Sequence, residues 1–257
     1  RDNTLRNTYA GKAVINVSGG LYPPFTGAIS TYNCSLMAAY QVCTAPEAVV
    51  VINVTGGTFN GQVSAIGQVG GNDVVNYTQK GSFYLNIFGG KWNKVYSGDG
   101  NFVYTVQNDL QAGIETANVI VSVDVDKLTY GDNNSMKFVS SGMIKSQLFL
   151  SKTAANITYS DFNKDYVGFA TIALPAGVTA ASITSVKVGS LEMKYAARVE
   201  GTNLIVPSDG TSSIELTAGG KSYAAAYGAT VFEGEGGAST TAASTTAAST
   251  TAPSTTA

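Results

Sequence analysis

The stretches Val-Ile-Asn-Val-Ser-Gly-Gly at 14–20, Val-Ile-Asn-Val-Thr-Gly-Gly at 51–57 and Leu-Asn-Ile-Phe-Gly-Gly at 85–90 share one pattern. The β-branched runs predict strands, and the glycine pairs predict tight turns in which glycine takes a positive φ. The first two copies start 37 residues apart, at 14 and 51, and the pattern does not recur after residue 90. Because a solenoid needs more copies at one constant period, we expect related hairpins within one sandwich.

Strand patterns fill most of the remaining chain, and turn signals such as Gly-Gly, Asn-Gly and Gly-Asp separate them. The expected strands are 13–17, 48–54, 58–65, 73–78, 82–88, 91–96, 102–107, 117–125, 143–150, 155–159, 166–174, 183–188, 191–197, 203–206, 213–216 and 222–232. Regular short strands with such punctuation predict an all-β fold, an antiparallel β-sandwich or jelly-roll-like structure. A division into two sandwiches near 115–130 remains open.

The chain divides into an N-terminal strand at 1–17, a sandwich body at 18–235 and a low-complexity tail at 236–257. The tail repeats Ala-Ser-Thr-Thr-Ala, and because five is odd, successive repeats would expose opposite faces of a strand. We therefore expect an extended tail, either a bare linker or an O-glycosylated stalk. The sugar-bearing hydroxyls would be Ser239, Thr240, Thr241, Ser244, Thr245, Thr246, Ser249, Thr250, Thr251, Ser254, Thr255 and Thr256.

Composition indicates an exported protein. The net charge is −2 without a basic run, so nucleic acid is not an expected partner. No run of 18 apolar residues predicts a membrane span. The sequence begins at Arg1, which suggests a mature secreted chain whose export signal has been removed, although an expression product can also begin without Met. We expect an extracellular location, as a cell-surface filament or coat.

The two cysteines, Cys34 and Cys43, are close in sequence and even in number. In an exported chain this favours a disulfide that closes a short loop, with two buried thiols as the alternative. Their spacing is not that of a C-x-x-C redox motif.

Catalysis is not expected. The chain contains no histidine, which removes Ser-His-Asp and Cys-His mechanisms and most zinc sites. No pair of carboxylates stands in a recognisable glycosidase context, and the Gly-rich stretches are not phosphate loops. We therefore predict a protein that is not an enzyme and has no cofactor apart from covalent glycans.

Asparagine sequons provide the candidate N-glycosylation sites. They are Asn16, Asn33, Asn53, Asn76, Asn133 and Asn156. Asn16 and Asn53 have apolar neighbours on both sides, so strand alternation places both side chains outward, where a glycan fits.

Oxygen donors at Asp161, Asn163 and Asp165 resemble the opening of a calcium loop. The sequence lacks the glycine and glutamate that an EF-hand requires, so solvated turns are the alternative to a Ca²⁺ site at a subunit junction. Asp124, Asp126 and Asp132 form a second, looser group.

Strand exchange between copies is the expected mode of assembly, because an exposed strand edge templates pairing with another chain. Segments 4–17 and 222–232 are the two candidate donor strands, and an ordinary terminal strand in its own sheet is the alternative for each.

At class level, residues 1–235 resemble secreted filament subunits joined by donor strands: archaeal threads, archaeal bundling pili and bacterial biofilm matrix fibres. The resemblance implies a jelly-roll-like sandwich, head-to-tail polymerisation and heavy glycosylation. We therefore expect a structural subunit of an extracellular filament whose partners are copies of itself. The alternatives are a carbohydrate-binding or adhesive module, in which Trp92 would contact sugar if its ring is exposed, and an S-layer or cell-wall coat protein.

Overall fold

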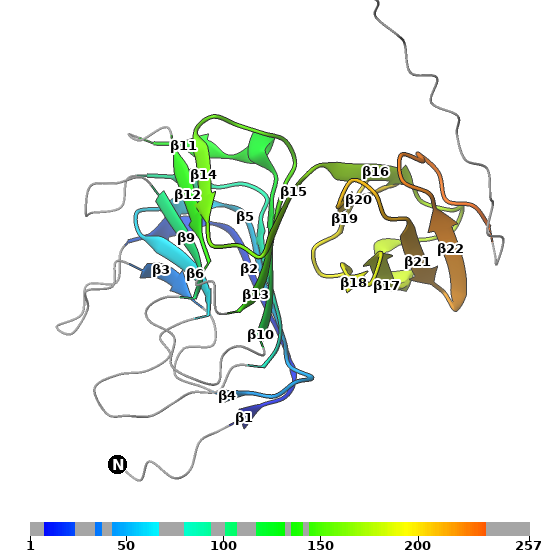
Figure 1. Ribbon diagram of the computed structural model, residues 1–257, viewed down its shortest axis with the longest axis horizontal. Helices are drawn as coiled ribbons and strands as arrows, with labels where there is room; N and C mark the ends of the chain where they lie inside the picture. The colour runs from blue at the N-terminus through cyan, green and yellow to red at the C-terminus, as the bar shows by residue number, and fades with distance from the viewer. Residues whose placement is uncertain are drawn as a thin grey trace, which may run out of the picture.

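The computed structural model describes residues 8–23, 34–37, 43–66, 80–93, 101–106, 117–131, 135–140 and 144–234. They form two bodies that lie side by side (Figure 1). The larger body, up to residue 167, is built from parallel strands, and the smaller body, from residue 169 onward, is built from antiparallel strands.

The first sheet of the larger body carries its main strands in chain order. They are β2 (Lys12–Tyr22), β5 (Val49–Phe59), β7 (Gly81–Ile87), β10 (Ala117–Val123), β13 (Lys145–Leu150) and β15 (Lys164–Val167). Two short strands, β8 (Lys91–Trp92) and β11 (Thr129–Tyr130), continue the sheet beside the end of β5, and the 3₁₀ helix η1 (Val125–Lys127) follows β10.

The second sheet faces the first (Figure 1), and its strands also follow chain order. They are β3 (Cys34–Met37), β6 (Gln62–Ile66), β9 (Asn101–Val106), β12 (Met136–Val139) and β14 (Ile157–Ser160). A separate pair joins β1 (Thr8–Tyr9) to β4 (Cys43–Thr44). Because the chain alternates between the two main sheets, each coil contributes one strand to each, and the body is a parallel β-solenoid.

The expected antiparallel sandwich is therefore wrong, because every described pair within these two sheets is parallel. The coils also differ in length. Asn16 lies opposite Asn53, 37 residues on, and Asn53 lies opposite Asn86, 33 residues on. Ser122 lies opposite Phe149, which is only 27 residues on. The strands keep their register while the connections vary, so the sequence shows no constant period. Because of this variation in coil length, the sequence pattern did not predict a solenoid.

The repeated glycine pairs let successive coils turn and stack closely. A Cβ on Gly56 would lie 2.3 Å from the Ser18 carbonyl oxygen, and one on Gly89 would lie 2.4 Å from the Thr55 carbonyl oxygen. Ser18 and Thr55 hold the position just before the glycine pair in the preceding coil. The second glycine of each pair has a φ of 95–98°, at Gly20, Gly57 and Gly90, which L-residues rarely adopt.

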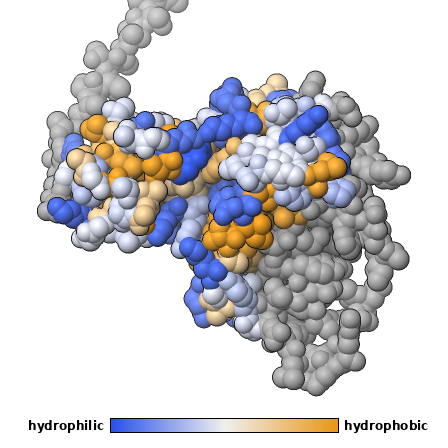
Figure 2. All heavy atoms as spheres, turned by 180° about the vertical axis from the view of Figure 1, so that it is seen from behind, coloured by the Kyte–Doolittle hydropathy of each residue, from blue (hydrophilic) through white to orange (hydrophobic). Residues whose placement is uncertain are grey.

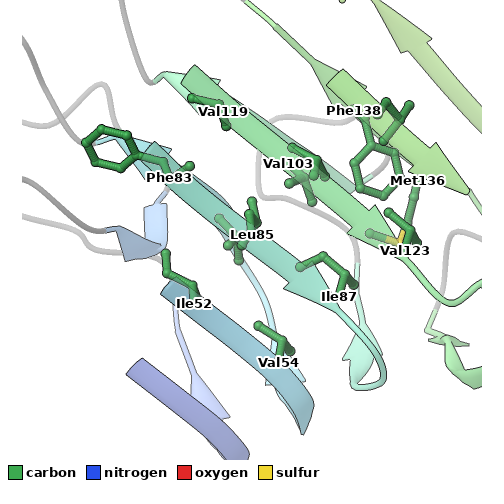
Figure 3. Packing of buried hydrophobic residues seen from close by; sticks show 14 of the residues in the cluster. Ile52, Val54, Phe83, Leu85, Ile87, Val103, Val119, Val123, Met136 and Phe138 are labelled. Atoms are coloured by element: carbon green, nitrogen blue, oxygen red, sulfur yellow. The ribbon is translucent and has the colours of Figure 1, made fainter. Parts of the chain in front are cut away.

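Apolar side chains from the two sheets fill the interior of the solenoid. Figure 3 shows residues of β5, β7 and β10 meeting Val103, Met136 and Phe138 of the second sheet. Residues in register on neighbouring strands form rows that point into the interior. One such row consists of Ile52, Leu85 and Val121 on successive strands. These rows bury an apolar surface along the whole body, which is the main favourable term in folding.

The smaller body contains two antiparallel sheets. One is formed by β16 (Phe169–Ala173), β19 (Arg198–Glu200) and β20 (Asn203–Pro207), and the other by β17 (Ile183–Val188), β18 (Leu191–Glu192), β21 (Ile214–Ala218) and β22 (Lys221–Ala225). The 3₁₀ helix η2 (Ala180–Ser182) precedes β17. The change from parallel to antiparallel pairing comes at Gly168, whereas residues 117–130, where the sequence suggested a division, lie inside the solenoid.

The smaller body packs on the outward face of the first sheet. Val51, Tyr84, Ile120 and Phe149 point away from the solenoid interior, yet all four are buried in one cluster with residues of the smaller body. Strands buried on both faces read as continuous apolar runs, such as 49–52 and 119–121. No helix in the described part of the chain is long and apolar enough to cross a bilayer.

Candidate interaction surface at the open edge of the solenoid

Strand β2 is the first strand of the first sheet and pairs on one side only, with β5. Among the described residues, no strand pairs with its other side. The Val49 N–H donates to the Gly11 carbonyl oxygen at 3.0 Å. Because peptide groups alternate in direction along a strand, those of residues 13, 15 and 17 point toward β5 and those of residues 12, 14 and 16 point to the open side.

The side chains of β2 leave apolar surface at this edge. Val14 is 43 % exposed and Leu21 is 66 % exposed. Ile15 and Val17 point inward and pack on the solenoid core. Figure 2 shows the molecule from behind, with hydrophobic areas on both bodies. A strand of eleven residues with an unpaired edge and apolar side chains is a template for pairing with another chain.

A ladder of asparagine amides ends at this edge. The Asn86 Nδ2 donates to the Asn53 Oδ1 at 2.7 Å, and the Asn53 Nδ2 donates to the Asn16 Oδ1 at 2.9 Å. The Asn86 Nδ2 also donates to the Tyr195 carbonyl oxygen of the smaller body at 2.6 Å. Each amide thus bonds to the one in the preceding coil. The Asn16 Nδ2 donates to no described residue, so the ladder can be extended from Asn16.

A second ladder is aromatic and lies inside the solenoid. The rings of Tyr22 and Phe59 stack with centroids 4.8 Å apart, and those of Phe59 and Trp92 with centroids 4.5 Å apart. The Trp92 Nε1 donates to the Gly89 carbonyl oxygen at 3.1 Å. Trp92 is 0 % exposed. A buried ring cannot serve as a sugar platform, so Trp92 supports the coil stack instead.

The opposite end of the solenoid differs from the β2 end. Asp165 of β15 lies opposite Leu148, and Tyr159 of β14 lies opposite Phe138. Leu148 and Phe138 point into the solenoid, so Asp165 and Tyr159 occupy the next positions of inward-facing rows. The Tyr159 hydroxyl donates to the Asp165 Oδ2 at 2.7 Å, which raises the pKa of Tyr159. Phe162, in the turn between these strands, packs on the core. A polar pair and a ring therefore lie at this end, although the outer edge of β15 also pairs with no described strand and Val167 is 47 % exposed.

The three residues of the possible calcium loop lie at this β15 end. The Asn163 Oδ1 accepts a hydrogen bond from the Ser146 N–H at 2.6 Å, and Asp161 has a φ of 65° in the turn before it. With Asp165 bonded to Tyr159, two of the three oxygen donors are engaged in holding β15 and its turn. Among the described residues, no group of three acidic or cysteine side chains is placed to hold a metal ion.

The second acidic group joins the two bodies or pairs locally. The Arg198 Nη2 of the smaller body lies 2.6 Å from the Asp124 Oδ2 of the solenoid, and Asp126 pairs with Lys152. Asp132 lies outside the described residues.

The sequon asparagines differ in their surroundings. Asn16 is exposed on the open edge, and Asn53 is half-buried with both amide atoms in the ladder. Asn156 is half-buried in the turn before β14. Asn33, Asn76, Asn133 and the tail hydroxyls lie outside the described residues, as do the side chains of Cys34 and Cys43.

Polar contacts fix the smaller body on the first sheet. The Tyr84 hydroxyl donates to the Glu192 carbonyl oxygen at 2.9 Å, and burial raises the pKa of Tyr84 to about 12. Hydrogen bonds from Arg198 and Lys127 lower the pKa of Glu200 to about 2. The Tyr84 and Tyr195 rings meet edge to face at 5.4 Å. These groups hold the two bodies together.

The sequence did not predict the amide and aromatic ladders. Their signal was present, because Asn16 and Asn53 occupy the same place in two copies of one motif. In a parallel stack, equivalent positions become neighbours, so a repeated asparagine indicates a ladder.

Comparison with protein-family models, curated proteins and solved structures found no match. A functional proposal for this chain must therefore rest on its own geometry.

Proposed function

We propose that this chain is a structural subunit of an extracellular filament that associates with copies of itself by continuing its β-sheets across the subunit boundary. The observation that carries the proposal is the open edge of β2, which presents unpaired peptide groups beside exposed Val14 and Leu21. Main-chain hydrogen bonds along such an edge supply affinity without a binding pocket.

The route of assembly differs from the insertion of a donor strand into a sandwich. Both candidate donor segments pair within their own chain, β2 with β5 and β22 with β21. Sheet addition at an edge does not require either strand to leave its place. The proposal therefore replaces strand exchange with edge-to-edge pairing.

The build of the solenoid suits a load-bearing role. Amide and aromatic ladders connect successive coils, and the interior is filled by apolar rows. The Ser/Thr-rich tail and the sequons other than Asn16 support an extracellular location and covalent glycans as further parts of the proposal.

Electron microscopy and sedimentation velocity on the full chain test this function. We expect particles with a regular axial repeat and an average mass that rises with protein concentration. Monomers that persist across salt and concentration would overturn the proposal. Two-dimensional lattices would favour a coat protein instead.

A further inference from the structure

We propose that two copies pair through β2 in antiparallel orientation, about a two-fold axis at Asn16 that is perpendicular to the first sheet. This inference rests on the proposed self-association and names the partner edge, which is β2 of the second copy.

The orientation follows from the two faces of β2. One face is apolar and points into the solenoid, and the other carries Asn16 and points outward. A two-fold axis perpendicular to the sheet makes the strands antiparallel and places interior beside interior. A two-fold axis along the strand would instead place the apolar face of one copy beside the polar face of the other.

The register follows from the peptide groups and the side chains. Residues 12, 14 and 16 direct their N–H and C=O groups to the open side, so Asn16 opposite Asn16 forms a hydrogen-bonded antiparallel pair. In this register Val14 faces Ser18 and Ile15 faces Val17. The segment Val14-Ile-Asn-Val-Ser18 is thus complementary to itself, and the two free amides at the ladder ends meet.

Charge places no obstacle to this pairing. Lys12 is the only charged residue of β2. The antiparallel two-fold register places the two Lys12 residues at opposite ends of the ladder, so their ammonium groups lie far apart.

The β15 end of the solenoid is a poorer partner for β2. Strand β15 has four residues against eleven in β2, so most of the β2 edge would stay unpaired. The hydrogen-bonded Tyr159 and Asp165 also occupy the inward rows there, and head-to-tail stacking would bury them against Ile15.

A glycan on Asn16 and this contact exclude each other, because the sugar would occupy the amide nitrogen at the two-fold axis. We therefore expect the pairing in protein made without N-glycosylation, and its loss in protein that carries a sugar at Asn16.

Cysteine cross-linking of the unglycosylated full chain tests the register. Paired residues in this arrangement have Cα atoms about 5.5 Å apart, which a disulfide can span. We expect Asn16→Cys to give covalent dimers under mild oxidation. Ser18→Cys is the matched control, because it lies exposed on the same strand but faces Val14 of the second copy. Equal or better cross-linking of Ser18→Cys, or none with Asn16→Cys, would overturn the proposal.

The substitution Asn16→Asp supplies a second test that keeps the fold. The Asp carboxylate still accepts the hydrogen bond from the Asn53 Nδ2, but two negative charges then meet at the axis. We expect the dimer dissociation constant to rise at least tenfold at pH 7 and to recover near pH 4, where the carboxyl protonates. Filaments without Asn16 cross-linking would reject this contact alone, whereas a wild-type chain that never self-associates would reject the proposed function as well.

Discussion

Asn86 shows how one amide connects coils and bodies at once. Its Nδ2 group donates both to Asn53 of the preceding coil and to the Tyr195 carbonyl oxygen of the smaller body. Asn86 is fully buried, whereas Asn16 at the other end of the ladder is exposed. We therefore expect Asn86 to contribute far more than Asn16 to the free energy of unfolding, although both belong to the same ladder.

We predict that Asn86→Ala lowers the free energy of unfolding by about 1–3 kcal/mol, because two half-buried acceptors lose a fully buried donor. Urea denaturation followed by circular dichroism measures the change. Asn16→Ala is the control and should cost well under about 1 kcal/mol, since water can replace its contact. Equal losses in the two variants would contradict a buried bridging role for Asn86.

At the scale of elements, the space around each glycine pair depends on whether another coil stacks on it. Gly56 and Gly19 occupy the same position in two copies of the motif. A Cβ on Gly56 meets the Ser18 backbone, whereas a Cβ on Gly19 meets nothing within 4 Å. The difference arises because Gly19 belongs to the coil of β2, on whose outer side no described coil stacks.

We predict that Gly56→Ala destabilises the solenoid by about 1–3 kcal/mol, because backbone must shift to admit the methyl group. Gly19→Ala should be neutral or slightly stabilising, since it only restricts the unfolded chain. Thermal unfolding of the two variants gives the comparison. A large loss for Gly19→Ala would mean that another segment already covers the coil of β2.

The positions of the strands followed from the sequence better than their partners did. The segments expected at 48–54, 82–88, 117–125 and 143–150 lie largely in β5, β7, β10 and β13. Alternation and β-branched content are local, so they identify a strand. Pairing depends on connections whose lengths vary from coil to coil, and the repeated motif at 14–20 and 51–57 is the sequence signal that marks two strands as neighbours.

The open edge at β2 was expected only in outline. The sequence indicated an assembly-prone strand near the N-terminus, but it could not show which peptide groups of that strand remain unpaired. That knowledge requires the position of β5, because the Gly11–Val49 bond decides which residues face the open side.

At the scale of the whole molecule, ion pairs at the junction make the docking of the two bodies sensitive to acid. Glu200 of β19 interacts with Arg198 and with Lys127 of the solenoid, and its pKa of about 2 lies below the usual value. A carboxyl with a depressed folded-state pKa stabilises above its unfolded pKa, and this contribution is lost as pH falls toward the folded value.

We therefore predict that thermal stability falls between about pH 4.5 and pH 2, in part through Glu200. The variant Glu200→Gln should show a weaker pH dependence over this window and little difference from wild type at its lower end. Calorimetry at a series of pH values measures both. An unchanged pH profile in the variant would show that Glu200 does not contribute.

A filament needs a second contact, because a two-fold contact alone stops at a dimer. Tyr227 and Val231 of the smaller body are 59 % and 56 % exposed and provide apolar surface on the other body. We predict that replacing both with Ser leaves the Asn16 cross-link intact but prevents longer assemblies in electron micrographs. Filaments of normal length in this variant would place the second contact elsewhere.

The smaller body rests on the outward face of four successive strands, at Val51, Tyr84, Ile120 and Phe149, instead of stacking on the outer edge of the last strand, β15. The tail follows the smaller body in the chain. Tension applied through the tail would therefore load strands β5, β7, β10 and β13 together, as a shear force across the first sheet. It would not pull β15 away first and then unfold the coils one after another.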